Sequence, residues 1–241
     1  MLFLSTPFDL DSANFLRKIV DVIKIASGDN TFLPLIDRCI SFKKPIIIST
    51  GLLKDNEIIK LYNYLKKKVD LKKVCLMHCV SSYPVENKDA NIGYISHLKK
   101  KFKKITIGYS DHTIGPEASI LAATLGSKVI EKHFTINKNY SSFRDHQLSA
   151  DISELKLISK FIKKIKILLG KGKKNNLSKS EIKNLKLLRR SIYAAKNIKK
   201  KEVFSEKNII HLRPFKKNNI SKYKSILNRK SKKTFRKGEL I

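Results

Sequence analysis

Short apolar runs rich in β-branched residues alternate with amphipathic stretches, and this alternation is the feature that most restricts the fold. The runs are Leu2–Ser5, Val22–Ser27, Pro45–Thr50, Val74–Cys79, Ile105–His112 and Val129–His133. The amphipathic stretches between them are Ser12–Val20, Thr31–Phe42, Asp55–Lys68, Asn91–Lys101 and Pro116–Gly126. Because near-continuous apolar strands that alternate with helices form parallel sheets covered on both faces, the sequence predicts an α/β fold of six βα units.

Polar residues gather directly after every one of these runs. The segments are STP (5–7), KIASGD (24–29), STG (49–51), HCVSSYP (78–84), YSDHT (109–113) and EKHFT (131–135). This is what a TIM-type (β/α)8 barrel with its active site at the carboxyl ends of the strands requires. A Rossmann-like sheet is the competing architecture, but no run is followed by GxGxxG and no GxxxxGK[ST] occurs. We therefore expect a barrel.

A closed barrel of this type needs eight strands, whereas the sequence shows six, the first of which starts at Leu2. We expect a barrel that lacks about its first two βα units. Three explanations are open: the chain is a fragment, its start is misassigned, or the fold is an open partial barrel. Exposed sheet edges would make an open barrel prone to aggregation.

Two neighbouring runs each end in a histidine, His112 and His133. The stretch between them begins with Pro116 and closes with Gly126, which is typical of one helix. A strand–helix–strand unit places its two strands side by side and parallel, so both imidazoles are expected at the same end of the sheet. Two converging imidazoles suggest a metal site in an enzyme.

The chain of 241 residues is strongly basic, with 52 Lys and Arg against 20 Asp and Glu. The lysines are spread over every predicted helix and no nucleic-acid recognition motif occurs, so we interpret the charge as solvated helix faces. The three cysteines form no disulfide framework, which fits a reduced cytoplasmic protein. No apolar run approaches the length of a membrane span, and no signal-peptide pattern opens the chain.

After the sixth run the pattern changes. Asp151 and Glu154 form a capping box that opens a helix running to about Leu169, which would end a barrel domain over residues 1–169. A linker is expected over 170–182 and a small β-rich domain over 183–241. The strands expected in the small domain lie in Ser191–Ile198, Glu202–Pro214 and Lys233–Ile241.

Eight segments in order carry a resemblance to a known family. They are FLSTPFD (3–9), KIASGDN (24–30), PIIISTG (45–51), LMHCVSSYP (76–84), GYSDHTIGPEA (108–118), VIEKHFT (129–135), RDHQLS (144–149) and RRSIYAAKNIKKKEVFSEKNIIHLRP (189–214). Through them the chain resembles the sialic acid synthase (N-acetylneuraminate synthase) family, including legionaminic and pseudaminic acid synthases, over essentially its whole length. The last segment resembles their SAF, or antifreeze-like, domain. Family members carry about 100 further residues, with the first two barrel strands, before the position of Leu2.

The resemblance implies a reaction that condenses phosphoenolpyruvate with an open-chain N-acyl hexosamine, such as N-acetylmannosamine, and water. The products are a nine-carbon α-keto acid and phosphate. His112 and His133 match the family's manganese ligands, so Mn²⁺ (or Mg²⁺) is the expected cofactor. Imidazole suits Mn²⁺ less than carboxylate does, so water and substrate oxygens would complete its coordination.

The resemblance also assigns substrate-binding residues. Those around phosphoenolpyruvate are Thr6, Lys24, Ser27, Ser49 and Ser110, together with Ser81, which stands where many members have asparagine. Lys24 also stands out by itself, because a lone lysine in an apolar strand is costly unless it meets an anion. Tyr83 matches a tyrosine on the sugar side of the site.

Two carboxylates and one arginine complete the expected site. Asp29 stands where many members have glutamate, a proposed acid/base near the attacking water, and its side chain is shorter by one methylene. Asp145 resembles a sugar-binding or proton-handling carboxylate. Arg213 matches the arginine that the SAF domain sends to the sugar's N-acyl group, in the family from the partner subunit of a homodimer.

Two other functions stay open. The first is a truncated, inactive remnant that acts at most as a sugar-binding or dimerising module, because the absent strands would hold phosphoenolpyruvate-binding and acid/base residues. The second is a basic polyanion-binding protein, which steeply salt-dependent DNA affinity without metal binding would support. We expect no specific nucleic acid and no membrane as partners.

Overall fold

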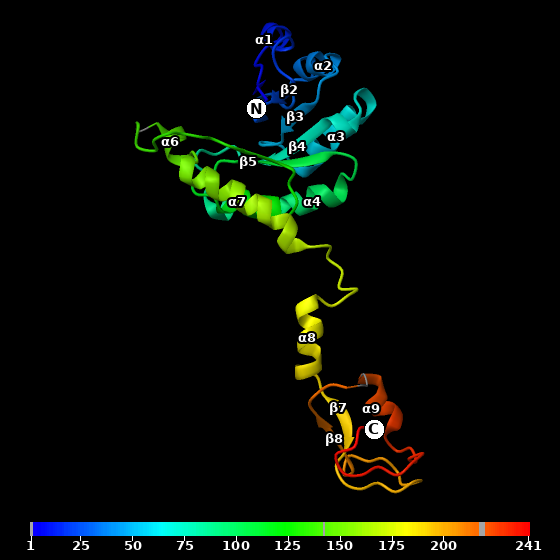
Figure 1. Ribbon diagram of the computed structural model, residues 1–241. Helices are drawn as coiled ribbons and strands as arrows, with labels where there is room; N and C mark the ends of the chain where they lie inside the picture. Colours follow the sequence, from blue (N-terminus) through cyan, green and yellow to red (C-terminus); the bar gives the residue numbers. More distant parts are fainter. Residues whose placement is uncertain (1, 142, 217–219) are drawn as a thin grey trace. The chain divides into compact units, whose positions relative to one another are not determined.

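The computed structural model describes residues 2–141, 143–216 and 220–241. The chain divides into two compact units, Met1–Gly170 and Lys171–Ile241, each of which is described by itself (Figure 1). The first unit contains the predicted βα repeats. The second covers the residues for which a linker over 170–182 and a small domain over 183–241 were predicted.

The first unit repeats strand and helix in order. Its strands are β1 (Leu4–Ser5), β2 (Val22–Ile25), β3 (Ile46–Ser49), β4 (Val74–Cys79), β5 (Thr106–Asp111) and β6 (Val129–Lys132). Its α-helices are α1 (Leu10–Leu16), α2 (Leu33–Ser41), α3 (Asp55–Lys68), α4 (Tyr94–Lys101), α5 (Glu117–Thr124), α6 (Arg144–Leu148) and α7 (Ile152–Leu169). Short 3₁₀ turns η1 (Ser27–Asp29), η2 (Leu71–Lys73) and η3 (Asn87–Asp89) lie between them. All six predicted strands are present, each within or close to its predicted range.

The order of the strands in the sheet decides between the two candidate architectures. The strands pair in parallel, in the order β1-β2-β3-β4-β5-β6. Since the order never reverses, the sheet has no topological switch point, which a doubly wound Rossmann-like sheet has. Every crossover advances in the same direction, as in a barrel, and the unit is a curled half-barrel (Figure 1). The predicted barrel-type fold is confirmed for these six strands.

Helix α5 shows why the local prediction worked. Pro116 precedes its first residue, and Gly126 follows with a positive φ of 97°. A glycine adopts this left-handed conformation without the steric cost that other residues meet, so it ends the helix. Ala118 and Ala122 turn inward to the core between helices and sheet, which contains Ile48 and Leu76.

The second unit has its own apolar core of Ile192, Ala194, Ile198, Phe204, Ile209 and Phe235. Strands β7 (Ser191–Ala194) and β8 (Ile209–Leu212) pair antiparallel within it. The strand predicted over Lys233–Ile241 is replaced by isolated pairs, Ile198 with Phe235 and Tyr193 with Leu240. Helix α9 (Ile220–Ile226) was not predicted.

Helix α8 (Lys179–Leu188) begins inside the range predicted as linker. Its start is fixed by a capping box in which Glu181 N donates to Ser178 Oγ at 3.1 Å and Ser178 N donates to Glu181 Oε2 at 2.9 Å. The sequence contains this Ser-x-x-Glu motif, but the motif follows a run of lysines and asparagines that is typical of a linker. The linker is therefore shorter than predicted.

Cys39, Cys75 and Cys79 are all buried free thiols. Within the described ranges, no helix combines the length and the apolar character needed to cross a bilayer.

Candidate functional site

A lysine, a glutamate and a serine from three different strands meet at the carboxyl ends of the sheet. Lys24 of β2 is buried, and its Nζ lies 3.1 Å from each carboxylate oxygen of Glu131 in β6. Ser110 Oγ of β5 donates to Glu131 Oε1 at 2.7 Å. Lys24 and Glu131 are 107 residues apart in the sequence, and only the curling of the sheet brings them together. The structure thus unites two predicted anion-binding residues, Lys24 and Ser110.

Glu131 is the member of this cluster that the sequence analysis missed. Its signal was weaker than that of Lys24, because Lys132 follows it in β6 and its side chain is 36% exposed. The carboxylate neutralises the lysine and holds its ammonium group in one place. An incoming anion therefore competes with Glu131 for Lys24.

Three of the predicted serines lie around the loops after β2, β3 and β4. A Cβ added to Gly51 would lie 2.3 Å from Ser81 Oγ and 2.6 Å from Ser27 Oγ, so a larger residue here would displace both serine hydroxyls. The loop is held by Asn30, whose Nδ2 donates to the carbonyl oxygens of Ser49 and Gly51 at 3.1 and 2.8 Å.

Within the described residues, two buried side-chain oxygens have no hydrogen-bond partner, Ser49 Oγ and Ser81 Oγ. Leaving a buried hydroxyl unpaired costs about 1–3 kcal/mol. Two such hydroxyls at the predicted anion site are therefore available to donate to a ligand that restores the lost hydrogen bonds.

The two predicted metal-ligating histidines face one another, with ring centroids 5.4 Å apart. His112 Nδ1 lies 3.0 Å from the carbonyl oxygen of Val80. Because a carbonyl only accepts, Nδ1 carries the proton, and Nε2 keeps the lone pair that a metal needs. Burial, with His112 nearby, lowers the pKa of His133 and favours its neutral, metal-binding form.

Two further predicted residues lie beside this pair. The ring of Tyr83 is 4.2 Å from that of His112 and 6.0 Å from that of His133, measured between centroids. The Asp145 carboxylate, on α6, is 3.9 Å from His133 Nδ1. The structure therefore brings Tyr83 and Asp145 to the histidine pair.

A buried ion pair explains why the histidines meet. Asp111 and Lys132 are register partners in β5 and β6, and Lys132 Nζ lies 3.0 Å from Asp111 Oδ2. Their side chains are only 0% and 4% exposed. His112 and His133 directly follow the last residues of β5 and β6, so the register of Asp111 with Lys132 also places the two rings side by side.

The candidate ligands supply only part of the coordination that a divalent metal needs. Among the described residues, no group of three or more His, Cys, Asp or Glu side chains is placed to hold a metal ion. His112 and His133 would supply two imidazole ligands, and water or substrate oxygens would have to supply the rest. This agrees with a site that binds metal and substrate together.

Three predicted residues stay outside these clusters. Within the described part of the chain, no side-chain hydrogen bond joins Thr6 or Asp29 to the other candidate residues, although both follow strand ends. Asp29 is the last residue of η1 and is half-buried. Arg213 belongs to the second unit, where its Nε donates to the Leu188 carbonyl oxygen at 2.7 Å.

The first unit and the beginning of the second match a known protein family. The profile of the NeuB family matches residues 1–174, which include every candidate residue except Arg213. The chain belongs to the NeuB family. The match ends after the first unit, and the resemblance of the second unit to a SAF domain stays a prediction.

Relatives of this NeuB-family chain are nonulosonic acid synthases. The N,N'-diacetyllegionaminic acid synthase of Campylobacter jejuni is 40% identical over 99% of the chain and 71% of its own length. The pseudaminic acid synthase of the same species is 35% identical over 100% of the chain and 69% of its own. The solved N-acetylneuraminic acid (sialic acid) synthetase of Leptospira borgpetersenii superposes with a TM-score of 0.70 and 36% identity, covering 77% of the chain and 64% of its own.

Proposed function

We propose that this chain is a nonulosonic acid synthase that condenses phosphoenolpyruvate with an N-acyl hexosamine and water, giving a nine-carbon α-keto acid and phosphate. One observation carries the proposal. The Lys24–Glu131–Ser110 cluster and the His112–His133 pair project from the same end of one parallel sheet. An anion-binding cluster beside a pair of imidazoles that can bind a metal is what the two substrates require.

The anion half of the site suits phosphoenolpyruvate, which carries a carboxylate and a phosphate. Lys24 supplies a buried cation, and a charge-assisted hydrogen bond from it is about twice as strong as a neutral one. The unpaired hydroxyls of Ser49 and Ser81 and the nearby Ser27 supply further donors. Glu131 holds Lys24 in position before the anion arrives and then shares it.

The part of the site around His112 and His133 suits the N-acyl hexosamine substrate. A divalent ion bound there would act as a Lewis acid on the sugar aldehyde. His112 presents Nε2 because Val80 fixes its Nδ1 proton, while Tyr83 packs against its ring. Asp145 lies within reach to handle a proton beside His133. We propose Asp29 as the carboxylate that activates water and Thr6 as a further phosphoenolpyruvate contact.

For the second unit we propose a SAF domain whose Arg213 binds the sugar's N-acyl group in the partner subunit of a homodimer. We also propose that the enzyme acts in the cytoplasm and uses Mn²⁺ or Mg²⁺. A dimer of this kind predicts that Arg213→Ala raises the KM for the hexosamine and leaves that for phosphoenolpyruvate unchanged.

A coupled assay of phosphate release from phosphoenolpyruvate, with N-acetylmannosamine and Mn²⁺, tests the proposed reaction. It is run on this chain and on a version extended at its N-terminus by the two βα units of a relative. Activity that is lost in Lys24→Met and in His112→Ala supports the site. If the extended version releases no phosphate with any N-acyl hexosamine tried, the proposed reaction is wrong.

A second candidate is an inactive module that still binds sugar or dimerises. Calorimetry with N-acetylmannosamine separates the two, because the module would bind the sugar and show no phosphate release with either version.

A further inference from the structure

Helix α6 carries Asp145 to His133, yet this helix has little stability of its own. It spans five residues, which is less than two turns, and Phe143 at its N-terminus has no side chain that could cap it. Isolated helices shorter than about 12 residues are marginal in water, so contacts with the rest of the unit must set the direction of α6. The position of Asp145 therefore depends on how α6 is held.

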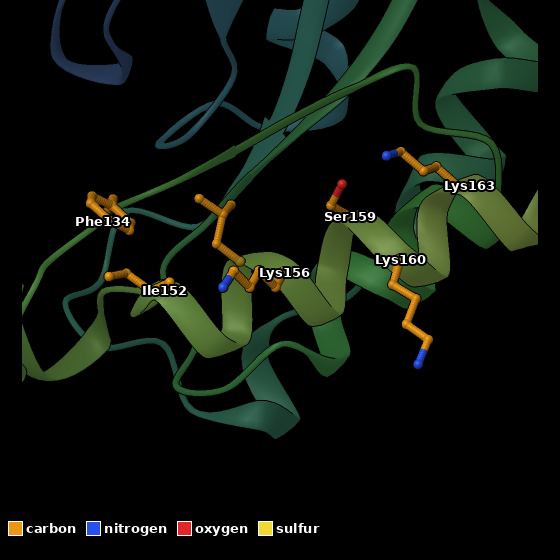
Figure 2. A pocket seen from close by; sticks show the side chains of 7 residues that line it. Phe134, Ile152, Lys156, Ser159, Lys160 and Lys163 are labelled. Carbon is orange, nitrogen blue, oxygen red and sulfur yellow. The ribbon is translucent and has the colours of Figure 1, made fainter.

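The loop that carries α6 leaves β6 and returns to α7, and its two ends are joined by backbone hydrogen bonds. Ala150 N donates to the His133 carbonyl oxygen at 2.8 Å, and Thr135 N donates to the Ala150 carbonyl oxygen at 3.0 Å. Phe134 and Ile152, which lie beside these ends, line one groove (Figure 2). These contacts fix the base of the loop, but they do not reach α6 itself.

A side-chain hydrogen bond connects α6 to the start of the loop. His146 Nδ1 lies 3.1 Å from Thr135 Oγ1. The Thr135 hydroxyl donates its one proton to the carbonyl oxygen of Asn137 at 3.0 Å. Its oxygen therefore accepts from His146, and Nδ1 of that imidazole carries the proton. Thr135 is only 7% exposed, and a hydrogen bond shielded from water is electrostatically stronger than an exposed one.

We propose that His146 is a positioning residue, which through its hydrogen bond to Thr135 holds α6 so that Asp145 lies beside His133. Adjacent residues of a helix project about 100° apart around its axis, so anchoring His146 also sets the direction of Asp145. The Asp145 carboxylate lies 3.9 Å from His133 Nδ1 in this arrangement. The inference rests on the proposed function only for its effect on the hexosamine, which Asp145 would contact.

Two apolar contacts also hold α6, and they define the alternative, in which packing alone positions the helix. Leu148 is fully buried, and the Tyr140 ring lies 5.3 Å from that of His146, measured between centroids. If packing were enough, His146→Leu would behave like the unaltered protein. If the hydrogen bond is needed, His146→Asn is the better replacement, because its side-chain amide can still donate to Thr135.

Amide hydrogen exchange of the full chain tests the positioning without any reaction. In Thr135→Val, which keeps the shape of the side chain and removes its hydroxyl, we expect the Ser149 amide, which donates to the Asp145 carbonyl oxygen, to exchange about tenfold faster. Thr135→Ser keeps the hydroxyl and should restore the original rate. The control is Thr124→Val, because the Thr124 hydroxyl bonds only within its own helix, to the Ile120 carbonyl oxygen. An unchanged rate in Thr135→Val would overturn the proposal.

Kinetics of the N-terminally extended version test the effect on the proposed reaction. His146→Leu should raise the KM for the hexosamine about tenfold and leave that for phosphoenolpyruvate unchanged, and His146→Asn should recover most of the loss. An unchanged hexosamine KM in His146→Leu, or equal losses in both variants, would overturn the proposal. If the extended version converts no hexosamine while the exchange rates change as expected, the proposed reaction is wrong and the positioning role of His146 stands.

Discussion

The ion pair of Lys132 with Asp111 sets the spacing of the histidine pair, and replacing Lys132 with methionine tests this directly. Methionine keeps most of the lysine's length but removes its charge. Asp111 would retain hydrogen bonds from Thr113 N at 2.9 Å, Thr113 Oγ1 at 2.8 Å and Ser119 Oγ at 2.6 Å. It would lose its only cationic partner among the described residues, in a position that is 0% exposed.

The expected loss of stability is large. Removing one partner of a buried ion pair leaves an uncompensated buried charge, which costs about 3–5 kcal/mol. The exposed pair of Lys68 with Asp37 is the matched control, because its partners are 41% and 40% exposed. Exposed pairs contribute about 0–1 kcal/mol, so Lys68→Met should have little effect on the free energy of unfolding.

Urea denaturation measures the stability, and titration with Mn²⁺ measures the positioning of the histidines. We expect Lys132→Met to weaken Mn²⁺ binding under conditions in which the protein is still folded, and Lys68→Met to leave it unchanged. The double variant Asp111→Leu, Lys132→Met should regain much of the stability, since an apolar pair avoids the desolvation of two charges. A stability loss below about 1 kcal/mol, or unchanged Mn²⁺ affinity in Lys132→Met, would refute the reasoning.

Three further predictions concern other residues. Gly51→Ala should abolish calorimetrically detected phosphoenolpyruvate binding, because its Cβ would collide with two serine hydroxyls, whereas Gly28→Ala meets nothing within 4 Å and should bind normally. Glu131→Gln should tighten phosphoenolpyruvate binding by removing the anion that competes for Lys24, and weaker binding than in the unaltered protein would contradict this. Burial lowers the pKa of His78 in the folded protein below its ordinary value of 6.5. As the pH falls, this histidine is therefore protonated in the unfolded chain before it is protonated in the folded one. The urea midpoint of unfolding should fall as the pH drops below about 6.5. His78→Gln should reduce that pH dependence, and an unchanged slope would show that the dependence arises elsewhere.

The helices and strands of the first unit could be predicted because their signals are local. The period of apolar residues located all six strands, and the proline and glycine around α5 located its ends. The errors are also local. The predicted strands included His112 and His133, which lie one residue beyond β5 and β6. Helix α6 is five residues long, too short for a periodic pattern to be recognised.

The candidate site was predicted less completely. Family resemblance identified Lys24, Ser110 and the two histidines, which the structure brings into two clusters. It did not identify Glu131, which stands beside Lys132 in the half-exposed strand β6. The roles of all these residues stay predictions. For Thr6, Asp29 and Arg213, the described residues also show no side-chain hydrogen bond to another candidate residue.

By itself, the sequence determined the βα alternation and the polar residues at each strand end. The reason is that the spacing of apolar residues, the helix caps and the turn residues each depend on only a few neighbouring positions. Tertiary structure alone decided that Lys24 meets Glu131 across 107 residues, and that Asp111 and Lys132 set the two histidines side by side. Such contacts depend on strand order and register, which no local pattern encodes. They form when the sheet curls to bury its apolar faces.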